Sequence, residues 1–334
     1  MKEKITEIAH EKNVDILYIT EYGSKLYGTN SESSDTDYKV IFLPKLKDVL
    51  ICNFQNSFSI STGTNNSKNS NEDIDIEFYS LQYWMNNVKK GETGALDILF
   101  SIFRKDTQLY IDENFETQIK SNYKNYFTAT EAEAYIRYAL AQMNTYSIKG
   151  ERLKILEDIN DYLNNLNETL YEQRINDIFN ELKHFLDNEY CHIDSKHITI
   201  LGKKHDLNTF VFELRNRINN LYKKYGHRAQ KAKECNGFDF KAVSHALRTI
   251  FEMEELLTTE FIHFPLKSAN KIKQVKYGEI KKEEALQYIN DKINQVSLIL
   301  KDKKINNDNQ IKYNKDIANQ LIFNMYRRKY VCEI

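Results

Sequence analysis

The sequence predicts an α+β fold, in which a small mixed sheet flanked by helices is followed by a mostly helical C-terminal domain. Most of the short apolar or alternating segments, each of a length typical of a strand, lie in the first third of the chain. Beyond residue 130, apolar residues recur at helical spacing over long stretches. The chain contains only two prolines and ten glycines, a composition that favours long helices.

Length, charge and cysteine content restrict the class of protein. At 334 residues, the chain is long enough for two ordinary domains. Its 47 basic and 48 acidic residues give a net charge of −1, so a nucleic-acid partner would need a local basic patch. The four cysteines lack the spacing of a disulfide framework or a structural zinc site. No stretch has the apolar character of a signal peptide or membrane helix, and we expect a cytoplasmic protein with no membrane partner.

The first part of the chain is predicted to contain one helix, three strands and a loop. Residues 2–12 carry isoleucines at helical spacing and predict a helix. Apolar or alternating segments then predict strands at residues 14–20, 38–43 and 54–61. Residues 61–72 are rich in Ser, Asn and Thr, cannot bury an apolar face, and predict a mobile loop.

A fourth strand and a long helical region complete the predicted organisation. Residues 73–81 alternate strictly between polar and apolar side chains, which predicts a half-buried strand. A further short strand is expected at residues 197–201. Helical patterns cover residues 130–146, 151–190, 206–233, 239–259 and 282–302. We therefore expect two domains, residues 1–125 and residues 126–334.

A Gly-Ser pair and two aspartates follow the first predicted strand. Gly23 and Ser24 stand where a turn brings backbone N–H groups, a hydroxyl and the start of a helix against a phosphate. Asp35 and Asp37 flank Thr36 at the entry to the second strand, where the two-residue period points both carboxylates to one side. Mg²⁺ prefers such hard oxygen ligands. Because an isolated Asp-x-Asp is commonly a solvated turn, the prediction depends on the whole combination.

The strand over residues 73–81 supplies a third carboxylate. Its alternation places Asp73, Asp75 and Glu77 on one face. We assign Asp75, the central one, as the third metal ligand and general base, with Glu77 as the alternative. In a two-metal scheme, Asp35 and Asp37 would hold the cations, while Asp75 would help to deprotonate an attacking hydroxyl.

At these residues the sequence resembles a known superfamily. GSKLYGTNSESSDTDYKVIF resembles the GSxxYG…SDxDxxxI signature of DNA polymerase beta-type nucleotidyltransferases, and most closely the predicted members found among RNA-repair genes. Two further segments resemble that branch, DIEFYSLQYWMNNVKKGETGALDILFS and FDFKAVSHALRTIFEMEELLTTEFIHFPL followed by VKYGEI. The resemblance covers about residues 15–105 and 238–290 and does not extend to residues 150–235.

The resemblance implies a metal-dependent nucleotidyltransferase with the nucleotidyltransferase fold. Such an enzyme transfers a nucleoside monophosphate from a triphosphate, bound with Mg²⁺ or Mn²⁺, to a hydroxyl acceptor and releases pyrophosphate. The family roles place phosphate binding on Gly23 and Ser24, and metal binding on Asp35, Asp37 and Asp75. The acceptor would be an RNA end, a protein side chain or a small molecule. The alternative is a catalytically inactive nucleotide- or partner-binding module of the same fold; the sequence does not indicate the preferred nucleotide or the oligomeric state.

Further candidates lie in the helical half. Lys241, His245 and Arg248 follow one another at i, i+4 and i+7 on one helix face, and Arg248 offers a fork of donors to phosphate oxygens. The resembling family carries the same His-x-x-Arg pattern, which favours nucleotide binding over a solvated or internally paired face. The basic run at residues 223–233 would suit an RNA acceptor, with a solvated helix face as the alternative.

Overall fold

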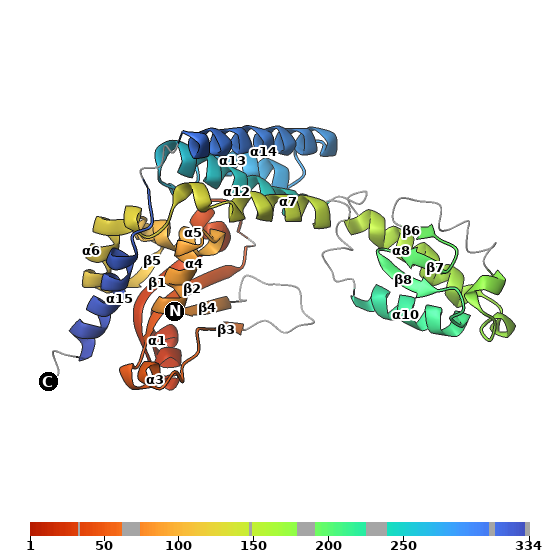
Figure 1. The fold of residues 1–334 in the computed structure, drawn as a ribbon, viewed down its shortest axis with the longest axis horizontal. Coiled ribbons are helices and arrows are strands. Elements are labelled where there is room, and N and C mark those ends of the chain that lie inside the picture. The colour runs from red at the N-terminus through yellow and green to blue at the C-terminus, as the bar shows by residue number, and fades with distance from the viewer. Residues whose placement is uncertain are drawn as a thin grey trace. The chain divides into compact units, whose positions relative to one another are not determined.

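Within the described residues, a five-stranded mixed sheet organises the N-terminal part of the chain (Figure 1). The computed structural model describes residues 1–32, 34–61, 74–146, 149–178, 191–224, 239–306 and 311–330. The strand order is β3-β4-β2-β1-β5, with β2 and β4 parallel and the other neighbours antiparallel. The strands are β1 (Val14–Tyr22), β2 (Thr36–Pro44), β3 (Ser57–Ser61), β4 (Ile74–Ser80) and β5 (Gln108–Ile111).

The described helices of this part of the chain precede or follow the strands in sequence. They are α1 (Lys2–Glu11), α2 (Gly23–Tyr27), α3 (Leu46–Leu50), α4 (Leu81–Lys89), α5 (Thr93–Ser101) and α6 (Glu113–Asn122), with short 3-10 helices η1 (Lys105–Thr107), η2 (Tyr123–Asn125) and η3 (Ala129–Glu131). The change from strand to helix after β4 has a local cause. The Ser80 hydroxyl accepts a hydrogen bond from the backbone N–H of Tyr83 at 3.3 Å and so caps α4.

The two faces of the sheet differ because alternate residues of a strand point to opposite sides. One face forms a buried core with α1, made of Ile5, Ile19, Tyr38, Val40, Phe42, Ile76 and Phe78. On the other face of β2, Asp37 and Lys39 come first and the buried Ile41 and Leu43 follow. Strand β2 is therefore apolar on one face, while its other face is polar at the N-terminal end and apolar beyond it.

The described chain groups into two units, each built from segments distant in sequence. Unit 1 contains Met1–Leu140, His245–Gln274 and Leu286–Ile334, and unit 2 contains Ala141–Ser244 and Val275–Ala285. This grouping differs from the boundary expected at residue 125, because C-terminal helices pack within unit 1. Gln82 of α4, for example, donates a hydrogen bond to the Tyr326 hydroxyl at 2.7 Å. The C-terminal helices are α12 (Phe240–Thr259), α13 (Ala269–Lys276), α14 (Lys282–Ile305) and α15 (Lys315–Tyr330).

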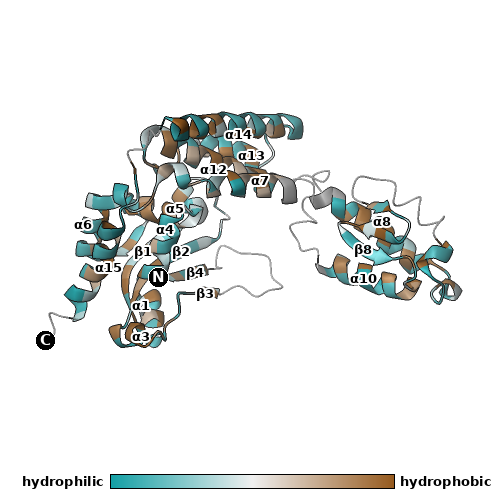
Figure 2. Cartoon of the chain, in the orientation of Figure 1, coloured by the Kyte–Doolittle hydropathy of each residue, from teal (hydrophilic) through white to brown (hydrophobic). Residues whose placement is uncertain are grey.

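Unit 2 has a hydrophobic core of its own. Its described elements include an antiparallel sheet of β6 (Cys191–Ile193), β7 (His197–Ile200) and β8 (Lys203–Asp206), with α8 (Lys149–Asn165), η4 (Glu168–Leu170), η5 (Ile175–Ile178) and α10 (Val211–Lys224). The helix α7 (Ala134–Tyr146) precedes them. Buried residues of the core include Leu156, Ile159, Ile198, Ile200, Leu214 and Ile218. Helices of both units carry hydrophilic and hydrophobic residues along their length (Figure 2), as expected for one-sided packing.

The predicted α+β class is confirmed, together with most of the predicted elements. The strands expected at residues 14–20, 38–43, 54–61, 73–81 and 197–201 correspond to β1, β2, β3, β4 and β7. Of the helical pattern expected over residues 151–190, the structure describes α8 to Asn165 and then η4 and η5, and residues 179–190 lie outside the described residues; the pattern expected over 206–233 begins at Val211. The prediction did not include β5, β6, β8, α3, α6, α13 or α15. Residues 62–73, with Asp73, and residues 225–233 of the basic run lie outside the described residues.

No helix among the described residues combines the length and the apolar composition that crossing a bilayer requires.

The separate cores predict separate unfolding transitions. Leu214→Ala removes a fully buried side chain from the unit 2 core and is expected to destabilise that unit by about 2–5 kcal/mol. The only tryptophan of the chain, Trp84, is buried in unit 1 and reports on that unit. In urea, the transition seen by tryptophan fluorescence should stay in place while part of the far-UV circular dichroism transition moves to lower urea. The control Leu96→Ala in unit 1 should move the fluorescence transition; a shift of both signals with Leu214→Ala would contradict separate units.

Candidate active site

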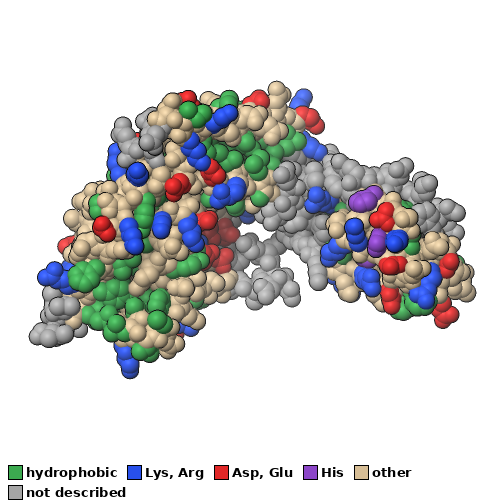
Figure 3. Space-filling model, in the orientation of Figure 1, with side chains coloured by type: hydrophobic (Ala, Val, Ile, Leu, Met, Phe, Trp, Pro, Cys, Tyr) green, Lys and Arg blue, Asp and Glu red, His purple; other side chains and the backbone are tan. Residues whose placement is uncertain are grey.

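Acidic side chains meet where β2 and β4 begin. These strands are parallel, and their register pairs Asp37 with Asp75. Neighbouring strands lie about 4.8 Å apart, and paired residues of parallel strands point to the same face, so the two carboxylates stand side by side. Asp35 precedes β2 by one residue and contributes a third negative charge. In the space-filling view, acidic side chains gather at the edge of unit 1 near β2 and β4 (Figure 3).

This crowding affects the protonation of Asp37. Burial raises the pKa of Asp37, and the negative charges of Asp35 and Asp75 raise it further. The Lys39 ammonium opposes these effects but does not cancel them. The ionised form of Asp37 is therefore destabilised in the protein alone, and a cation beside it would relieve the repulsion.

Glu77, the alternative third acid, has a different environment from Asp75. Its carboxylate forms an ion pair with Lys39 at 2.5 Å and accepts a hydrogen bond from the Tyr79 hydroxyl. Burial raises the pKa of Glu77, but these two hydrogen bonds and the positive charge of Lys39 together hold the pKa below its ordinary value. Lys39 also lies 4.8 Å from the centre of the Tyr22 ring. Glu77 is thus already paired with a cation of the chain.

Gly23 lies directly against the Asp37 carboxylate. Its φ of +62° belongs to the left-handed region that favours glycine. A Cβ atom at this position would overlap the Asp37 Oδ2 and lie 3.1 Å from its Cγ. The register explains this proximity, since Tyr22, the residue before Gly23, pairs with Asp37 across β1 and β2. The Gly-Ser turn and the acidic pair therefore form one continuous site.

The helix α2, which carries Gly23 and Ser24, is anchored at its C-terminal end. The Arg104 guanidinium donates hydrogen bonds to the backbone carbonyls of Lys25 and Leu26 at 3.2 and 2.6 Å. Gly28 ends the helix with a φ of +74°, and a Cβ there would lie 2.7 Å from the Cβ of Pro265. These contacts at the C-terminal end of α2 fix the position of the Gly-Ser turn at its N-terminal end.

The donor set at this site suits a hard divalent cation. Carboxylate oxygens are the ligands that Mg²⁺ prefers, together with waters and substrate phosphates. Asp37 and Asp75 are neighbours, and Asp35 lies near enough to raise the pKa of Asp37. In the part of the chain that the structure describes, no three His, Cys, Asp or Glu side chains are grouped closely enough to hold a metal ion by themselves.

Arg248 of α12 serves a buried network in unit 1. Its Nη1 donates to both carboxylate oxygens of Glu252 at 2.8 Å and to Asp97 at 3.2 Å. The guanidinium carbon lies 4.1 Å from the centre of the Tyr27 ring. Burial raises the pKa of both Asp97 and Glu252 against the opposing charge of Arg248. The internally paired alternative thus describes this side chain, and a phosphate contact by Arg248 stays a prediction.

The other two candidates, Lys241 and His245, lie on the same helix as Arg248. His245 is half-buried in unit 1, whereas Lys241 is exposed and belongs to unit 2. Nucleotide binding by Lys241 and His245 stays a prediction. Lys39 and Asp97 were not among the residues predicted from the sequence. A lysine two residues after Asp37 and a lone acid inside the apolar segment ALDILF could have indicated them.

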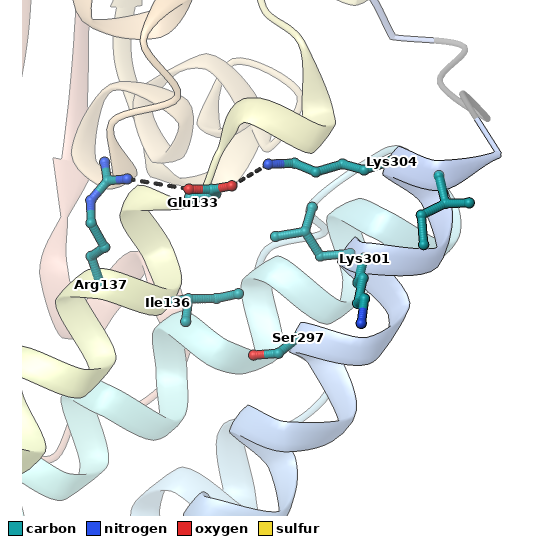
Figure 4. A pocket seen from close by; sticks show the side chains of 8 residues that line it. Glu133, Ile136, Arg137, Ser297, Lys301 and Lys304 are labelled. Atoms are coloured by element: carbon teal, nitrogen blue, oxygen red, sulfur yellow. Dashed lines mark hydrogen bonds and ion pairs between the residues drawn. The ribbon is translucent and has the colours of Figure 1, made fainter.

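A pocket of about 320 Å³ lies elsewhere in unit 1, between α7 and α14 (Figure 4). Glu133 forms ion pairs there with Arg137, at 3.7 Å, and with Lys304. The pocket is lined by Glu133, Ile136, Arg137, Ser297, Leu300, Lys301, Lys304 and Ile305. None of these is a predicted site residue.

Comparison with known proteins bears on the family of the chain. Residues 1–306 match the model of the RNA repair pathway DNA polymerase beta family, RlaP. The chain belongs to this family. The predicted resemblance to polymerase beta-type nucleotidyltransferases is thereby confirmed, and the RlaP match also covers residues 150–235, to which the resemblance did not extend.

Individual proteins are similar to this RlaP member to different degrees. An uncharacterised 38.9 kDa protein from the nrdC-mobD intergenic region of Enterobacteria phage T4 is 32% identical over 296 residues, which cover 82% of this chain and 86% of that protein. Among solved structures, a nucleotidyltransferase-like protein from Exiguobacterium sibiricum matches with a TM-score of 0.26 and 8% identity, covering 98% of this chain and 78% of that one. At that score and identity, the structural likeness supports no conclusion.

Gly23 provides a direct test of the contact between the turn and the acids. Gly23→Ala is expected to displace the Asp37 carboxylate and to weaken Mg²⁺ binding, measured as the loss of the rise in melting temperature caused by Mg²⁺ and nucleoside triphosphate. Gly202→Ala is the matched control, because Gly202 has a φ of +79° with no atom within 4 Å of an added Cβ. It should add only about 1–2 kcal/mol of backbone strain. An equal loss of the Mg²⁺ effect in both variants would contradict a specific role for the contact.

Asp37→Asn is expected to stabilise the protein in the absence of divalent cations. Because the pKa of Asp37 is raised by folding, the stability contribution of its protonated form is lost as the pH rises through that pKa. At pH 7 in EDTA, the uncharged variant should melt about 1–4 °C higher than the wild type. The difference should shrink below the ordinary pKa of aspartate, where both side chains are neutral. A lower melting temperature of the variant at pH 7 would contradict this account of the site.

Proposed function

We propose that this RlaP protein is a metal-dependent nucleotidyltransferase that transfers a nucleoside monophosphate from a triphosphate to a hydroxyl acceptor. The observation that supports this most is the pairing of Asp37 with Asp75 on parallel strands, directly against the Gly-Ser turn at Gly23. This arrangement supports the proposal, because in-line phosphoryl chemistry needs carboxylates for a metal ion close to a turn that can bind phosphate.

Each group of the site has a proposed role. Asp35, Asp37 and Asp75 would hold Mg²⁺ or Mn²⁺, which when bound neutralises the triphosphate and favours the ionised acceptor hydroxyl. Gly23 and Ser24 would bind the triphosphate through backbone N–H groups and the hydroxyl. Asp75 would accept the proton of the attacking hydroxyl. The hydroxyl oxygen then bonds to the α-phosphorus, the bond from that phosphorus to the bridging oxygen breaks, and pyrophosphate leaves with the electron pair.

Asp75 is preferred to Glu77 as the base because of their partners. Glu77 is held by Lys39 and Tyr79, and its pKa is lowered, so it is a poor proton acceptor. Asp75 instead stands beside Asp37. An RNA end is the acceptor class that the family's RNA repair pathway suggests, with a protein side chain and a small molecule as alternatives.

Label transfer tests the proposal. The wild type, with Mg²⁺ or Mn²⁺ and each α-labelled triphosphate, is expected to label an acceptor from a panel of RNA ends, proteins and small molecules. The double variant Asp35→Ala/Asp37→Ala should lose this transfer. Nucleotide binding by the wild type without transfer or pyrophosphate release on any acceptor would instead favour a non-catalytic binding module.

The third acid is tested by a matched pair of amide variants. Asp75→Asn should reduce transfer by about 10²–10⁴-fold, because it removes a base and a metal ligand. Glu77→Gln should retain most of the activity, since its amide oxygen still accepts hydrogen bonds from Lys39 and Tyr79. Initial rates at saturating triphosphate measure both. The reverse result would move the base to Glu77.

A further inference from the structure

Two tyrosines attach the Gly-Ser turn to a single buried carboxylate. Tyr22 ends β1 immediately before Gly23, and Tyr27 ends α2. The Tyr22 hydroxyl donates to Oδ2 of Asp97 at 3.0 Å, and the Tyr27 hydroxyl donates to the same oxygen at 2.8 Å. One carboxylate of α5 therefore holds the chain on both sides of the turn that carries Gly23 and Ser24.

Asp97 is itself held by groups that do not belong to the turn. It is completely buried, and it accepts hydrogen bonds from Arg248 of α12 at 3.2 Å and from the Tyr135 hydroxyl of α7 at 3.3 Å. Arg248 is fixed in turn by the completely buried Glu252. Four donors from the turn, α7 and α12 thus converge on Asp97.

Folding stability alone does not account for this arrangement. Two buried acids share one arginine, and such groups lose more solvation than they regain unless the geometry is well satisfied. Replacement of a whole buried ion pair or triad by well-packed apolar residues is often neutral or stabilising. What the carboxylate adds is a fixed acceptor for two specific hydroxyls.

The same attachment reaches the acidic pair. Tyr22 pairs with Asp37 across β1 and β2, and Gly23 contacts the Asp37 carboxylate. A displacement of Tyr22 would therefore move the backbone N–H groups of the turn and the position of Asp37 together. Positioning errors of this kind are costly for phosphoryl transfer, because catalysis depends on alignment.

We propose that Asp97 is a positioning residue of the nucleotide site, which sets the Gly23–Ser24 turn through the hydroxyls of Tyr22 and Tyr27. Arg248, which is buried, would influence the turn through its hydrogen bond to Asp97. This inference rests on the proposed function, since it assigns the turn to a triphosphate.

Three tyrosine-to-phenylalanine variants separate positioning from packing. Tyr22→Phe and Tyr27→Phe each delete a hydroxyl that connects the turn to Asp97, whereas Tyr135→Phe deletes a hydroxyl that reaches the same carboxylate from α7. All three keep the ring, so the fold should be retained. The readouts are the melting temperature, the Kd for Mg²⁺ with a triphosphate analogue that carries a methylene between the α- and β-phosphorus, and the split of KM and kcat.

The double variant Tyr22→Phe/Tyr27→Phe is expected to raise the Kd for the analogue about tenfold and to lower kcat as well. Tyr135→Phe should lower the melting temperature while leaving the Kd unchanged. If all variants lost melting temperature equally and the Kd stayed unchanged, the network would have only a structural role. That result would overturn the inference, while the proposed function would stand. A wild type that neither binds the analogue nor transfers a nucleotide would overturn both.

Discussion

The register between β2 and β4 is the constraint on which the candidate site depends. It sets Asp37 beside Asp75, and a slip by one residue would turn one of the two carboxylates to the opposite face. The register is held by the apolar side chains of the other face, where Val40 and Phe42 pack with Ile76 and Phe78 in one core. The chemistry of one face is thus fixed by the packing of the other, and the acids need no mutual attraction to stay together.

Charge distribution along these strands distinguishes acids that differ little in sequence. Asp75 and Glu77 are two residues apart on the same face, yet Lys39 pairs with Glu77 at 2.5 Å. Lys39 thereby keeps one carboxylate ionised and occupied, while burial and like charges raise the pKa of Asp37. Lys39 thus makes Glu77 part of an ion pair, while the repulsion among the remaining acids favours a cation beside Asp37.

The sequence predicts the features that depend on neighbouring residues, such as strands and short motifs. It does not predict contacts between residues that are distant in sequence. Alternation revealed β4, and the strand followed by Gly23, Ser24, Asp35 and Asp37 gave the site its first outline. The pairing of Lys39 with Glu77 depends on the register of two strands 38 positions apart, which no local pattern contains. The four-residue edge strand β5 is too short for a clear alternation. The grouping of α12 with the sheet depends on buried contacts such as that between Arg248 and Asp97, 151 positions apart.

In helix α12, the motif predicts which side chains share a face but not what those side chains contact. The spacing of His245 and Arg248 places them on neighbouring turns of one helix, and the structure contains that helix. Helical spacing specifies which residues share a face but not what that face meets. Arg248 forms ion pairs with Asp97 of α5 and with Glu252, one turn further along α12, so the guanidinium is neutralised inside unit 1. Because Asp97 also accepts hydrogen bonds from both tyrosines that flank the Gly-Ser turn, Arg248 is connected to that turn through Asp97.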